Sequence, residues 1–342
     1  MIETFNDMII TLFIFLMILF VYLHVNFQLK TSNELEIYEI DQELSKTKME
    51  EICDLRQPIV LDTTEELSQL IPIINRSNIL REYSSYEIKI RNKKKIGTSD
   101  DLFIPLQIGI AEKLFTNDTT NNYYSENNND FLNESNLLKI IRENDFIMKP
   151  YLCCNSSYDI IFGSNDVEIP LRYEHNYRNY IMPTEGNIIV RLIPPKYNKY
   201  CNAMTDYENM EYRSEINVWN PQEKYKIIMK KIKYLDVELS VGRLLYIPAY
   251  WLYSVKFVGK SCALMMKYRT YTNVLAVSPS LIMNLLQNQN IKTSYLKKLE
   301  LETMVSKKEA EEVEVEVEVE EEKGNEGKNK SVESFENIET LK

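Results

Sequence analysis

The sequence predicts a mainly β domain with flanking helices, an α+β fold, preceded by one N-terminal transmembrane helix. Residues 8–27 are almost entirely apolar, which is typical of a membrane span. Within residues 145–267, short apolar runs recur between turn residues, a rhythm that indicates an all-β domain. The formal net charge of -11 is concentrated near the C-terminus, because residues 309–322 contain nine Glu and no Lys. These observations define an anchor, a β domain and an acidic tail.

Residues 1–29 are predicted to be a transmembrane anchor that contacts the bilayer through residues 8–27. A helix of this length spans about 30 Å, the thickness of a bilayer core. A secretory signal would need a basic start and a small-residue cleavage site, whereas this run follows Glu3 and Asp7, so we expect it to be retained. Lys30 follows the run, and the positive-inside tendency then places the C-terminal domain in the cytosol. A buried core helix, the alternative, is disfavoured because the run has no polar stripe.

The region between the anchor and the strand-rich segment mixes helical and strand patterns. Residues 30–52 combine apolar residues at helical spacing with many charges, which predicts a helical stalk. Residues 116–136 hold eight Asn and few aliphatic residues, so we expect a surface insertion there. The other predicted elements of this region are a strand over residues 57–61, a short helix over residues 63–74 and a strand over residues 86–90.

The β domain is predicted to cover residues 53–278. Residues 223–234 carry five Lys, which favours a solvated helix face over an anionic contact patch. A helical pattern returns over residues 279–306, and residues 307–342 predict a disordered acidic tail, because like charges would repel in any strand ladder. The apolar runs of the β domain stand at residues 160–162, 188–193, 237–239, 244–247, 254–257 and 263–266.

Composition argues against several classes of site and partner. The chain has five Cys at irregular spacing and no paired C-x-x-C sets, which favours reduced thiols over a disulfide framework or a zinc site. Outside the tail the charge is near neutral and no broad basic face stands out, so we expect no nucleic-acid partner.

Three segments carry a resemblance to a known family. They are Ile-Pro-Leu-Arg-Tyr-Glu at residues 169–174, followed by Glu185-Gly186 and Leu192-Ile193-Pro194-Pro195; GRLLYIPAYWLY at residues 242–253; and KYRTYTN at residues 267–273. Together they resemble the JmjC and cupin-like group, over roughly residues 50–275. The resemblance implies a double-stranded β-helix, or jelly-roll, barrel. Similar proteins often carry a membrane span and occur in large DNA viruses of microbial eukaryotes, which implies a viral protein of a virion or host internal membrane.

The enzymes of this family are Fe(II) and 2-oxoglutarate dependent oxygenases, and the resemblance places their iron ligands on Arg172, Glu174 and Tyr253. Such an iron site needs two imidazoles and one carboxylate. The chain has two His, of which His24 lies in the predicted anchor. His175 is a poor substitute, because neighbouring strand residues point to opposite faces unless a bulge intervenes. We therefore expect no catalytic residue, no bound metal and neither of the family's cofactors.

Arg172 and Glu174 share one strand face, so we expect the guanidinium to occupy the place of the metal and neutralise the carboxylate. The alternative is that both side chains face solvent. The family's usual 2-oxoglutarate lysine falls on Ile188, which leaves Arg191 or Lys267 to hold a carboxylate. The candidates for lining a pocket are Tyr173, Tyr246, Tyr250, Trp251, Arg191, Lys267 and Arg269. For Tyr246, Tyr250, Trp251 and Tyr253, packing in the core or at the barrel mouth is favoured over an aromatic-lined ligand pocket. Structural hydrogen bonds are expected of Asp159, Arg178, Asn179 and Arg269.

The sequence favours a membrane-anchored, catalytically degenerate cupin-like module that binds an unknown protein or small molecule. An atypical Fe(II)/2-oxoglutarate-dependent oxygenase of the hydroxylase or demethylase type is the alternative, and a structural scaffold without a ligand is a third reading. The single His outside the anchor favours the first over the second. Whether side chains fill the barrel interior separates the first from the third.

Overall fold

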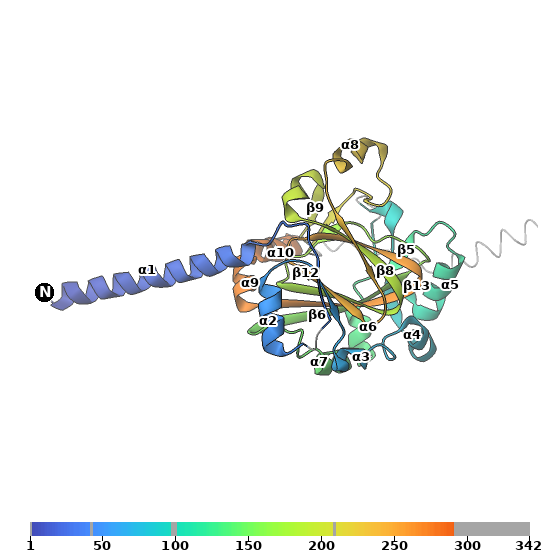
Figure 1. The fold of residues 1–342 in the computed structure, drawn as a ribbon, viewed down its shortest axis with the longest axis horizontal. Coiled ribbons are helices and arrows are strands. Elements are labelled where there is room, and N and C mark those ends of the chain that lie inside the picture. Colours follow the sequence, from blue (N-terminus) through green and yellow to red (C-terminus); the bar gives the residue numbers. More distant parts are fainter. Residues whose placement is uncertain (1, 42–43, 97–100, 208–209, 291–342) are drawn as a thin grey trace, which may run out of the picture. The chain divides into compact units, whose positions relative to one another are not determined.

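The computed structural model describes residues 2–41, 44–96, 101–207 and 210–290. The first of the two units of the chain, Met1–Gln289, holds the sheets and the helices that cover them (Figure 1). The strands are β1 Tyr38–Ile40, β2 Ile59–Asp62, β3 Glu87–Asn92, β4 Ile104–Gln107, β5 Tyr123–Ser125, β6 Cys153–Gly163, β7 Arg172–Tyr173, β8 Arg178–Ile193, β9 Ala203–Asp206, β10 Glu211–Ser214, β11 Leu235–Leu239, β12 Arg243–Pro248 and β13 Leu252–Thr270. The helices are α1 Ile2–Leu29, α2 Lys46–Asp54, α3 Glu65–Ser68, α4 Arg76–Tyr83, α5 Ile108–Asn117, α6 Asn129–Glu134, α7 Leu137–Asn144, α8 Lys226–Met229, α9 Tyr271–Ala276 and α10 Ser278–Asn290, with 3-10 turns at Lys93–Lys95, Pro195–Tyr200 and Glu223–Tyr225.

Two long strands, β8 and β13, each pass from one ladder into another. Residues 178–185 of β8 pair with residues 262–268 of β13, and residues 187–193 pair with residues 252–258. The first ladder continues through β12 to β2 and β1 on one side, and through β6 to β5, β3 and β4 on the other. The second continues to β11 on one side and to β7, β10 and β9 on the other. The described pairs are antiparallel, apart from the parallel pair of β1 and β2. This two-layered arrangement is typical of a jelly roll.

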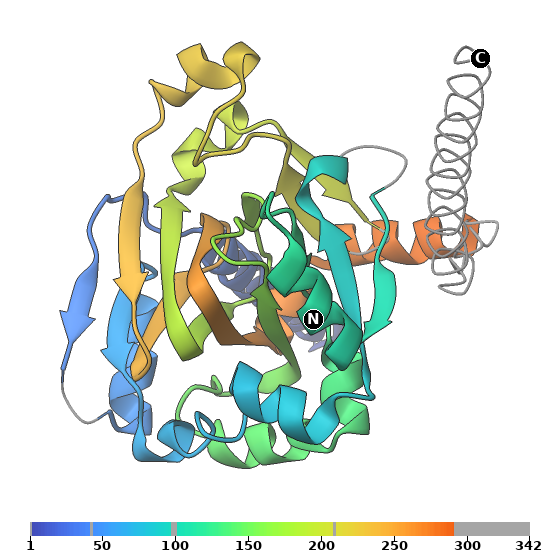
Figure 2. The same ribbon diagram turned by 90° about the vertical axis from the view of Figure 1, so that its right-hand side faces the viewer.

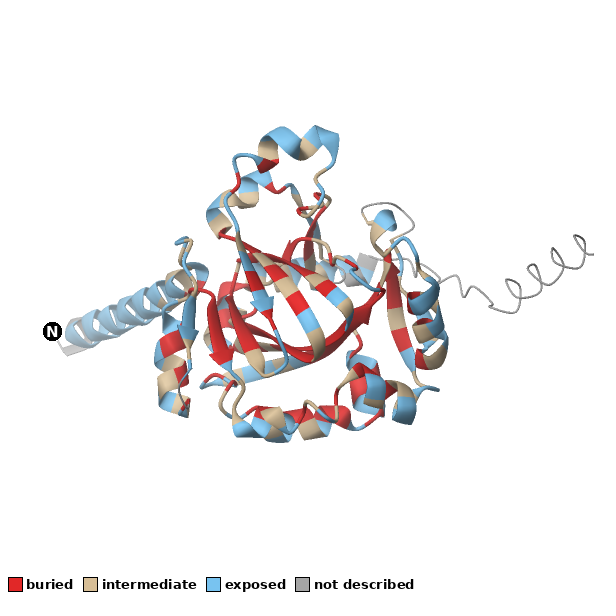
Figure 3. Cartoon of the chain, turned by 45° about the vertical axis from the view of Figure 1, so that its right-hand side comes forward, coloured by how far each residue is buried: buried red, intermediate tan, exposed pale blue. Residues whose placement is uncertain are grey.

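The two ladders enclose an apolar interior. Ile181 and Met265 point into it from the first ladder, and Val190 and Val255 point into it from the second. Side chains along the strands point alternately into this interior and to an outer face. In β11 of the second ladder, buried and more exposed residues therefore follow one another, whereas residues 178–184 of β8 are buried on both faces (Figure 3). The predicted mainly β fold with flanking helices is confirmed.

Glycine allows the sharp bend at which β8 leaves the first ladder for the second. Gly186 has a φ of +71°, and the pairing with β13 shifts register beside it, between Val258 and Ala263. A Cβ at Gly186 would approach the side chain of Ser261 and would lie 2.8 Å from the carbonyl oxygen of Lys260. Only a residue without a side chain fits this bend.

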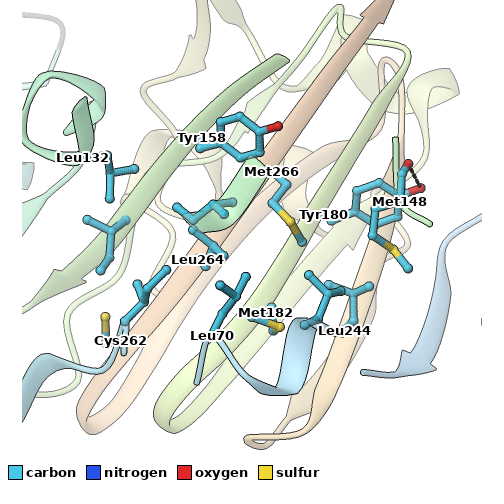
Figure 4. Close-up of a cluster of buried hydrophobic side chains, with 14 of the residues drawn as sticks. Leu70, Leu132, Met148, Tyr158, Tyr180, Met182, Leu244, Cys262, Leu264 and Met266 are labelled. Carbon is cyan, nitrogen blue, oxygen red and sulfur yellow. Dashed lines mark hydrogen bonds between the residues drawn. The ribbon is translucent and has the colours of Figure 1, made fainter. Parts of the chain in front are cut away.

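Helices α2 to α7 cover the outer face of the first ladder (Figure 1). Tyr180 and Met182 of β8 pack there with Leu264 of β13, against Leu70 and other helix-side residues (Figure 4). The Tyr180 hydroxyl donates a hydrogen bond of 3.3 Å to the Met148 carbonyl oxygen, so even the polar end of this side chain is paired. This cluster is the core that carries most of the helices.

Two predictions about local structure are wrong. Residues 30–52 do not form a helical stalk, since β1 pairs with β2 and α2 buries Met49 and Ile52 in the core. Residues 116–136 do not form a surface insertion, since β5 joins the sheet between β3 and β6 and α6 buries Phe131. Asn128 explains the second error, because its amide group donates to the Ser125 hydroxyl and the Ile160 carbonyl and is buried in doing so. An Asn-rich composition therefore does not guarantee exposure.

Other predicted elements agree with the structure more closely. The predicted strands over residues 57–61 and 86–90 correspond to β2 and β3, and the predicted short helix is α3. α3 ends at Ser68, earlier than predicted, and turns follow it. α10 accounts for the start of the predicted helical segment over residues 279–306. Residues 291–342, including the predicted acidic tail, lie outside the described residues.

α1 contains one helical stretch, Phe5–Leu29, that is long and apolar enough to cross a membrane. Its side chains from Phe5 to Leu23 are exposed (Figure 3). By length and composition the stretch fits a membrane anchor and fits a signal sequence equally well.

We predict that Gly186→Ala lowers the free energy of unfolding by roughly 3 kcal/mol or more, because the added methyl group meets backbone at a positive φ. Gly242→Ala is the matched control. Gly242 also has a positive φ, +94°, but its Cβ would have nothing within 4 Å, so a cost of about 1–2 kcal/mol is expected. Denaturant unfolding of the detergent-solubilised full chain measures both. Equal losses would contradict the bend described here.

Candidate functional site

Glu174, just after β7, stands at the end of the barrel where both long strands begin and finish. Its Oε1 accepts a hydrogen bond of 2.7 Å from the Lys267 ammonium and one of 3.1 Å from the Tyr253 hydroxyl. Tyr253 and Lys267 are far apart along β13, but the bend of that strand returns both to this end, since they pair with Leu192 and Asn179 at the two ends of β8. The barrel topology therefore brings both donors to one carboxylate oxygen.

Electrostatics keep Glu174 ionised. Burial acts to raise the pKa of this carboxyl, but the charge and hydrogen bond of Lys267, helped by the charge of Arg172, hold the pKa below its ordinary value. The side chains of Glu174 and Lys267 are each only 14% exposed, so solvent screens their ion pair weakly. The second carboxylate oxygen of Glu174, Oε2, accepts a hydrogen bond of 3.3 Å from the side-chain amide of Asn176.

Arg172 is buried, but the prediction that its guanidinium pairs with Glu174 is wrong. Among the described residues its guanidinium forms an ion pair with Glu126, not with Glu174. Glu126 follows β5, so the partner comes from the Asn-rich segment that was expected to be a surface insertion. The guanidinium carbon lies 5.8 Å from the ring centre of Tyr253, which keeps it beside the Glu174 site without bonding to it. The alternative, that both side chains face solvent, is wrong too, because Arg172 is buried and the Glu174 side chain is only 14% exposed.

Glu126 belongs to a buried group of three arginines and three acids, which we call the arginine–carboxylate cluster. The charges in it balance, and burial of ions is tolerated in proteins only with such pairing. Burial would raise the pKa of Glu126, but Arg172 and Arg91 hold the pKa below its ordinary value. The contacts are Arg172 with Glu126, Arg91 with Glu126 at 2.9 Å, with Glu211 at 3.1 Å and with Asp101 at 3.1 Å, and Arg213 with Glu211 at 2.9 Å and with Asp101 at 3.1 Å.

His175 packs among aromatic side chains at the barrel end. Its ring centre lies 4.0 Å from that of Tyr212 and 5.3 Å from that of Tyr250. Burial, with a contribution from the charge of Arg269, lowers the pKa of this imidazole to about 4, so it is neutral at physiological pH. Both Glu174 and His175 follow the last residue of β7, so the alternation of a strand does not by itself set the direction of the imidazole.

The donor atoms at the family's iron positions do not fit iron. The three positions hold a guanidinium, a carboxylate already bonded to an ammonium, and a phenol, whereas the iron site needs two imidazoles. In the described part of the chain no three His, Cys, Asp or Glu side chains are grouped so that they could hold a metal ion. We therefore assign no step of chemistry to a metal at this place.

The candidate pocket-lining residues do not gather in one place. Tyr173 and Tyr250 join His175 and Tyr212 at the barrel end, Trp251 packs in the interior, and Lys267 and Arg269 reach Glu174 and Asn176. Tyr246 lies on the outer face beneath α2, where its hydroxyl donates to the Cys53 carbonyl. Arg191 also points outward, between Trp219 and Tyr234, and pairs with Asp236. Tyr246 thus packs in the core, the interpretation favoured from the sequence, and Arg191 lies apart from the Glu174 site.

Asp159 is the buried acid whose role the sequence indicated only as structural hydrogen bonding. Its two oxygens accept bonds of 2.7 Å from the backbone N–H groups of Asn127 and Asn128. Burial raises the pKa of this carboxyl to about 6, although the charge of Lys267 and the two N–H bonds act to lower it. Asp159 thus fixes the turn that presents Glu126 to Arg172, a contact between distant segments that no local pattern reveals.

We predict that Lys267→Met lowers the free energy of unfolding by roughly 3–5 kcal/mol at pH 7, because it leaves the Glu174 carboxylate buried without its cation. The double variant Lys267→Met/Glu174→Gln should regain most of the loss. Arg81→Met is the control. Its ion pair with Glu82 is exposed, and a loss under about 1 kcal/mol is expected. Equal losses in Lys267→Met and in the double variant would show that the charge pairing does not matter.

The raised pKa of Asp159 predicts a defined pH dependence. A carboxyl whose pKa is about 6 in the folded state and about 3.9 when unfolded contributes stability below pH 4 and loses it as the pH rises through 6. Relative to Asp159→Asn, the native chain should lose roughly 2–3 kcal/mol of unfolding free energy between pH 4 and pH 7. Denaturant titrations at several pH values measure this difference. A difference that is constant with pH would contradict the raised pKa.

Comparison with known proteins agrees with this architecture. Residues 110–273 match the model of a family described as a cupin-like domain. The matched range runs from α5 to α9 and includes Arg172, Glu174, Tyr253 and Lys267. No curated protein matches the chain. The part of the chain from β5 to β13 is therefore similar to a cupin-like domain.

Proposed function

We propose that this chain is a membrane-anchored, catalytically degenerate cupin-like module that serves in binding or structure. The observation that carries the proposal is the contact of Lys267 and Tyr253 with one oxygen of Glu174. Glu174 is the only acid among the three positions that match the family's iron ligands. The Lys267 ammonium already neutralises the Glu174 carboxylate, which is the electrostatic role that a metal ion would have.

Charge repulsion, together with the unsuitable donor set, disfavours a metal ion near Glu174. A divalent cation near Glu174 would have to displace an ammonium held at 2.7 Å and would approach the buried guanidinium of Arg172. At short range in a poorly solvated site, like charges repel by several kcal/mol. The arginine–carboxylate cluster holds Arg172 in place through Glu126, so the guanidinium cannot simply turn away.

The anchor part of the proposal is supported by α1. Its apolar stretch carries no charged side chain after Asp7 and is exposed over the greater part of its length, so only a bilayer or another apolar partner would cover it. Its end is bonded to the β domain, which a signal sequence removed after targeting would not need. A cytosolic domain, a viral source and a virion or host internal membrane stay predictions from the sequence and the resemblance.

An atypical oxygenase remains the second candidate, because the fold is cupin-like and Glu174 keeps the family's carboxylate. The two candidates differ in whether the barrel holds iron and consumes 2-oxoglutarate.

We predict that the purified full chain takes up far less than one equivalent of Fe(II), Mn(II) or Zn(II), because its carboxylate is already paired. The positive control is Arg172→His/Tyr253→His/Lys267→Met, which supplies two imidazoles and frees Glu174. It should bind metal more tightly than the native chain. Metal content after dialysis measures both. Near-stoichiometric metal in the native chain that Glu174→Ala abolishes, with succinate formed from 2-oxoglutarate, would establish the oxygenase instead.

A further inference from the structure

The C-terminal end of α1 is fixed to the β domain by several bonds. Arg56 donates through its guanidinium to the carbonyl oxygens of Phe27, in the last turn of α1, and of Lys30, just after the helix. The guanidinium also stacks on the Phe27 ring at 3.9 Å. A cation at this end also complements the helix dipole. Gln28 donates a bond of 3.2 Å to the Thr272 hydroxyl of α9, and α1 packs against α9. The direction of α1 relative to the domain is therefore set by contacts.

An exposed apolar surface lies around this junction. Tyr271 and Leu275 of α9 are 67% and 48% exposed, and Leu285 of α10 is 61% exposed. Leu152, 74% exposed, adjoins them, because the Tyr271 N–H donates to its carbonyl oxygen. We call this the apolar surface and define it as Leu152, Tyr271, Leu275, Ile282, Leu285 and Leu286.

α10 is unusual for a helix at a protein surface because none of its residues is charged. Its apolar side chains Ile282, Leu285 and Leu286 are exposed, while Leu281 and Asn284 face the domain more closely. Its polar residues are Ser, Asn and Gln. A helix of this composition gains nothing from contact with water on its apolar side.

The ribbon views place this helix beside α1 and across its direction. Figure 1 shows α9 and α10 at the side of the domain from which α1 extends. In Figure 2, turned by 90°, α1 is foreshortened behind the sheets while α10, in orange, lies across the view. A helix that crosses a bilayer and a helix that lies along its surface have this mutual arrangement.

We propose that the apolar surface lies in the headgroup region of the same bilayer that α1 enters, with α10 along the membrane plane. The inference rests on the proposed anchoring by α1. The bilayer is the favoured occupant because the surface is continuous with the bonded end of α1, where lipid must be present if α1 spans. Tyr271 suits the interface, where an aromatic ring with a polar end is stable.

The test uses the full chain reconstituted in phosphatidylcholine vesicles. The background variant Cys153→Ser/Cys154→Ser removes the two partly exposed thiols and leaves Cys53, Cys201 and Cys262, which are buried. Single cysteines introduced as Leu285→Cys, Val258→Cys and Met17→Cys then carry an environment-sensitive fluorophore. Nitroxide-labelled lipids, with the nitroxide at the headgroup or deep in the acyl chain, quench the fluorophore according to its depth.

We expect the probe at Leu285 to be quenched severalfold more by the headgroup nitroxide than the probe at Val258. Val258 is 43% exposed in β13, beside the bend and far from α9 along that strand. The probe at Met17, midway along α1, should be quenched best by the deep nitroxide. Equal, weak quenching at Leu285 and Val258, with strong deep quenching at Met17, would overturn the apolar surface as a membrane contact and leave the anchor intact.

Other outcomes would also decide whether the proposal stands. Absence of deep quenching at Met17 would refute the anchoring itself. Protection of the Leu285 probe from aqueous iodide without quenching by lipid would mean that protein covers the surface, either a second copy or another segment, and would overturn the proposal. Leu286→Asp should weaken quenching at Leu285, whereas Ile227→Asp, at a residue 72% exposed in α8, should not.

Discussion

The constraint on which the structure depends is the passage of β8 and β13 from one ladder to the other. Because both strands bend at the same level, their two ends return to one end of the barrel, and residues distant in sequence become neighbours there. Tyr253 and Lys267 meet Glu174 for this reason alone. Gly186 permits the bend, so a residue without a side chain determines which polar groups can assemble.

At the barrel end, charged side chains of the protein neutralise one another. A metalloenzyme of this fold leaves a carboxylate uncompensated until the metal arrives, and its site is only complete when loaded. Here the protein itself provides the cation for Glu174, and Arg172 is matched by Glu126. Such pairing favours a single arrangement of side chains, because any exchange of partners would bury an unpaired charge.

The fold was largely predictable and the site only partly so. Apolar runs at strand spacing identified β2, β3 and most of the barrel, since each strand buries one face. The partner of Arg172 could not be found, because Glu126 lies in a segment whose Asn-rich composition indicates exposure and becomes buried only through distant bonds such as that of Asn128. The resemblance leaves Arg191 or Lys267 to hold the carboxylate of a ligand, but it does not predict the pairing of Lys267 with Glu174, which depends on the bend of β13. Core packing of Tyr246 was predictable, but not that it packs beneath α2, because the face of β12 that turns outward is fixed by tertiary pairing.

The short bonded junction between α1 and the domain has a mechanical consequence. A domain on a flexible linker would rotate freely about its attachment and adopt many orientations relative to the helix. With Arg56 holding the last turn of α1 and Gln28 holding α9, that freedom is removed, and the barrel end keeps one heading relative to the helix. Asn273 of α9 also donates to the His175 carbonyl, so the same helix that meets α1 braces the barrel end. A ligand or partner of Glu174 would have to approach from a restricted range of directions relative to α1. Torque on α1 would be transmitted directly to the barrel end.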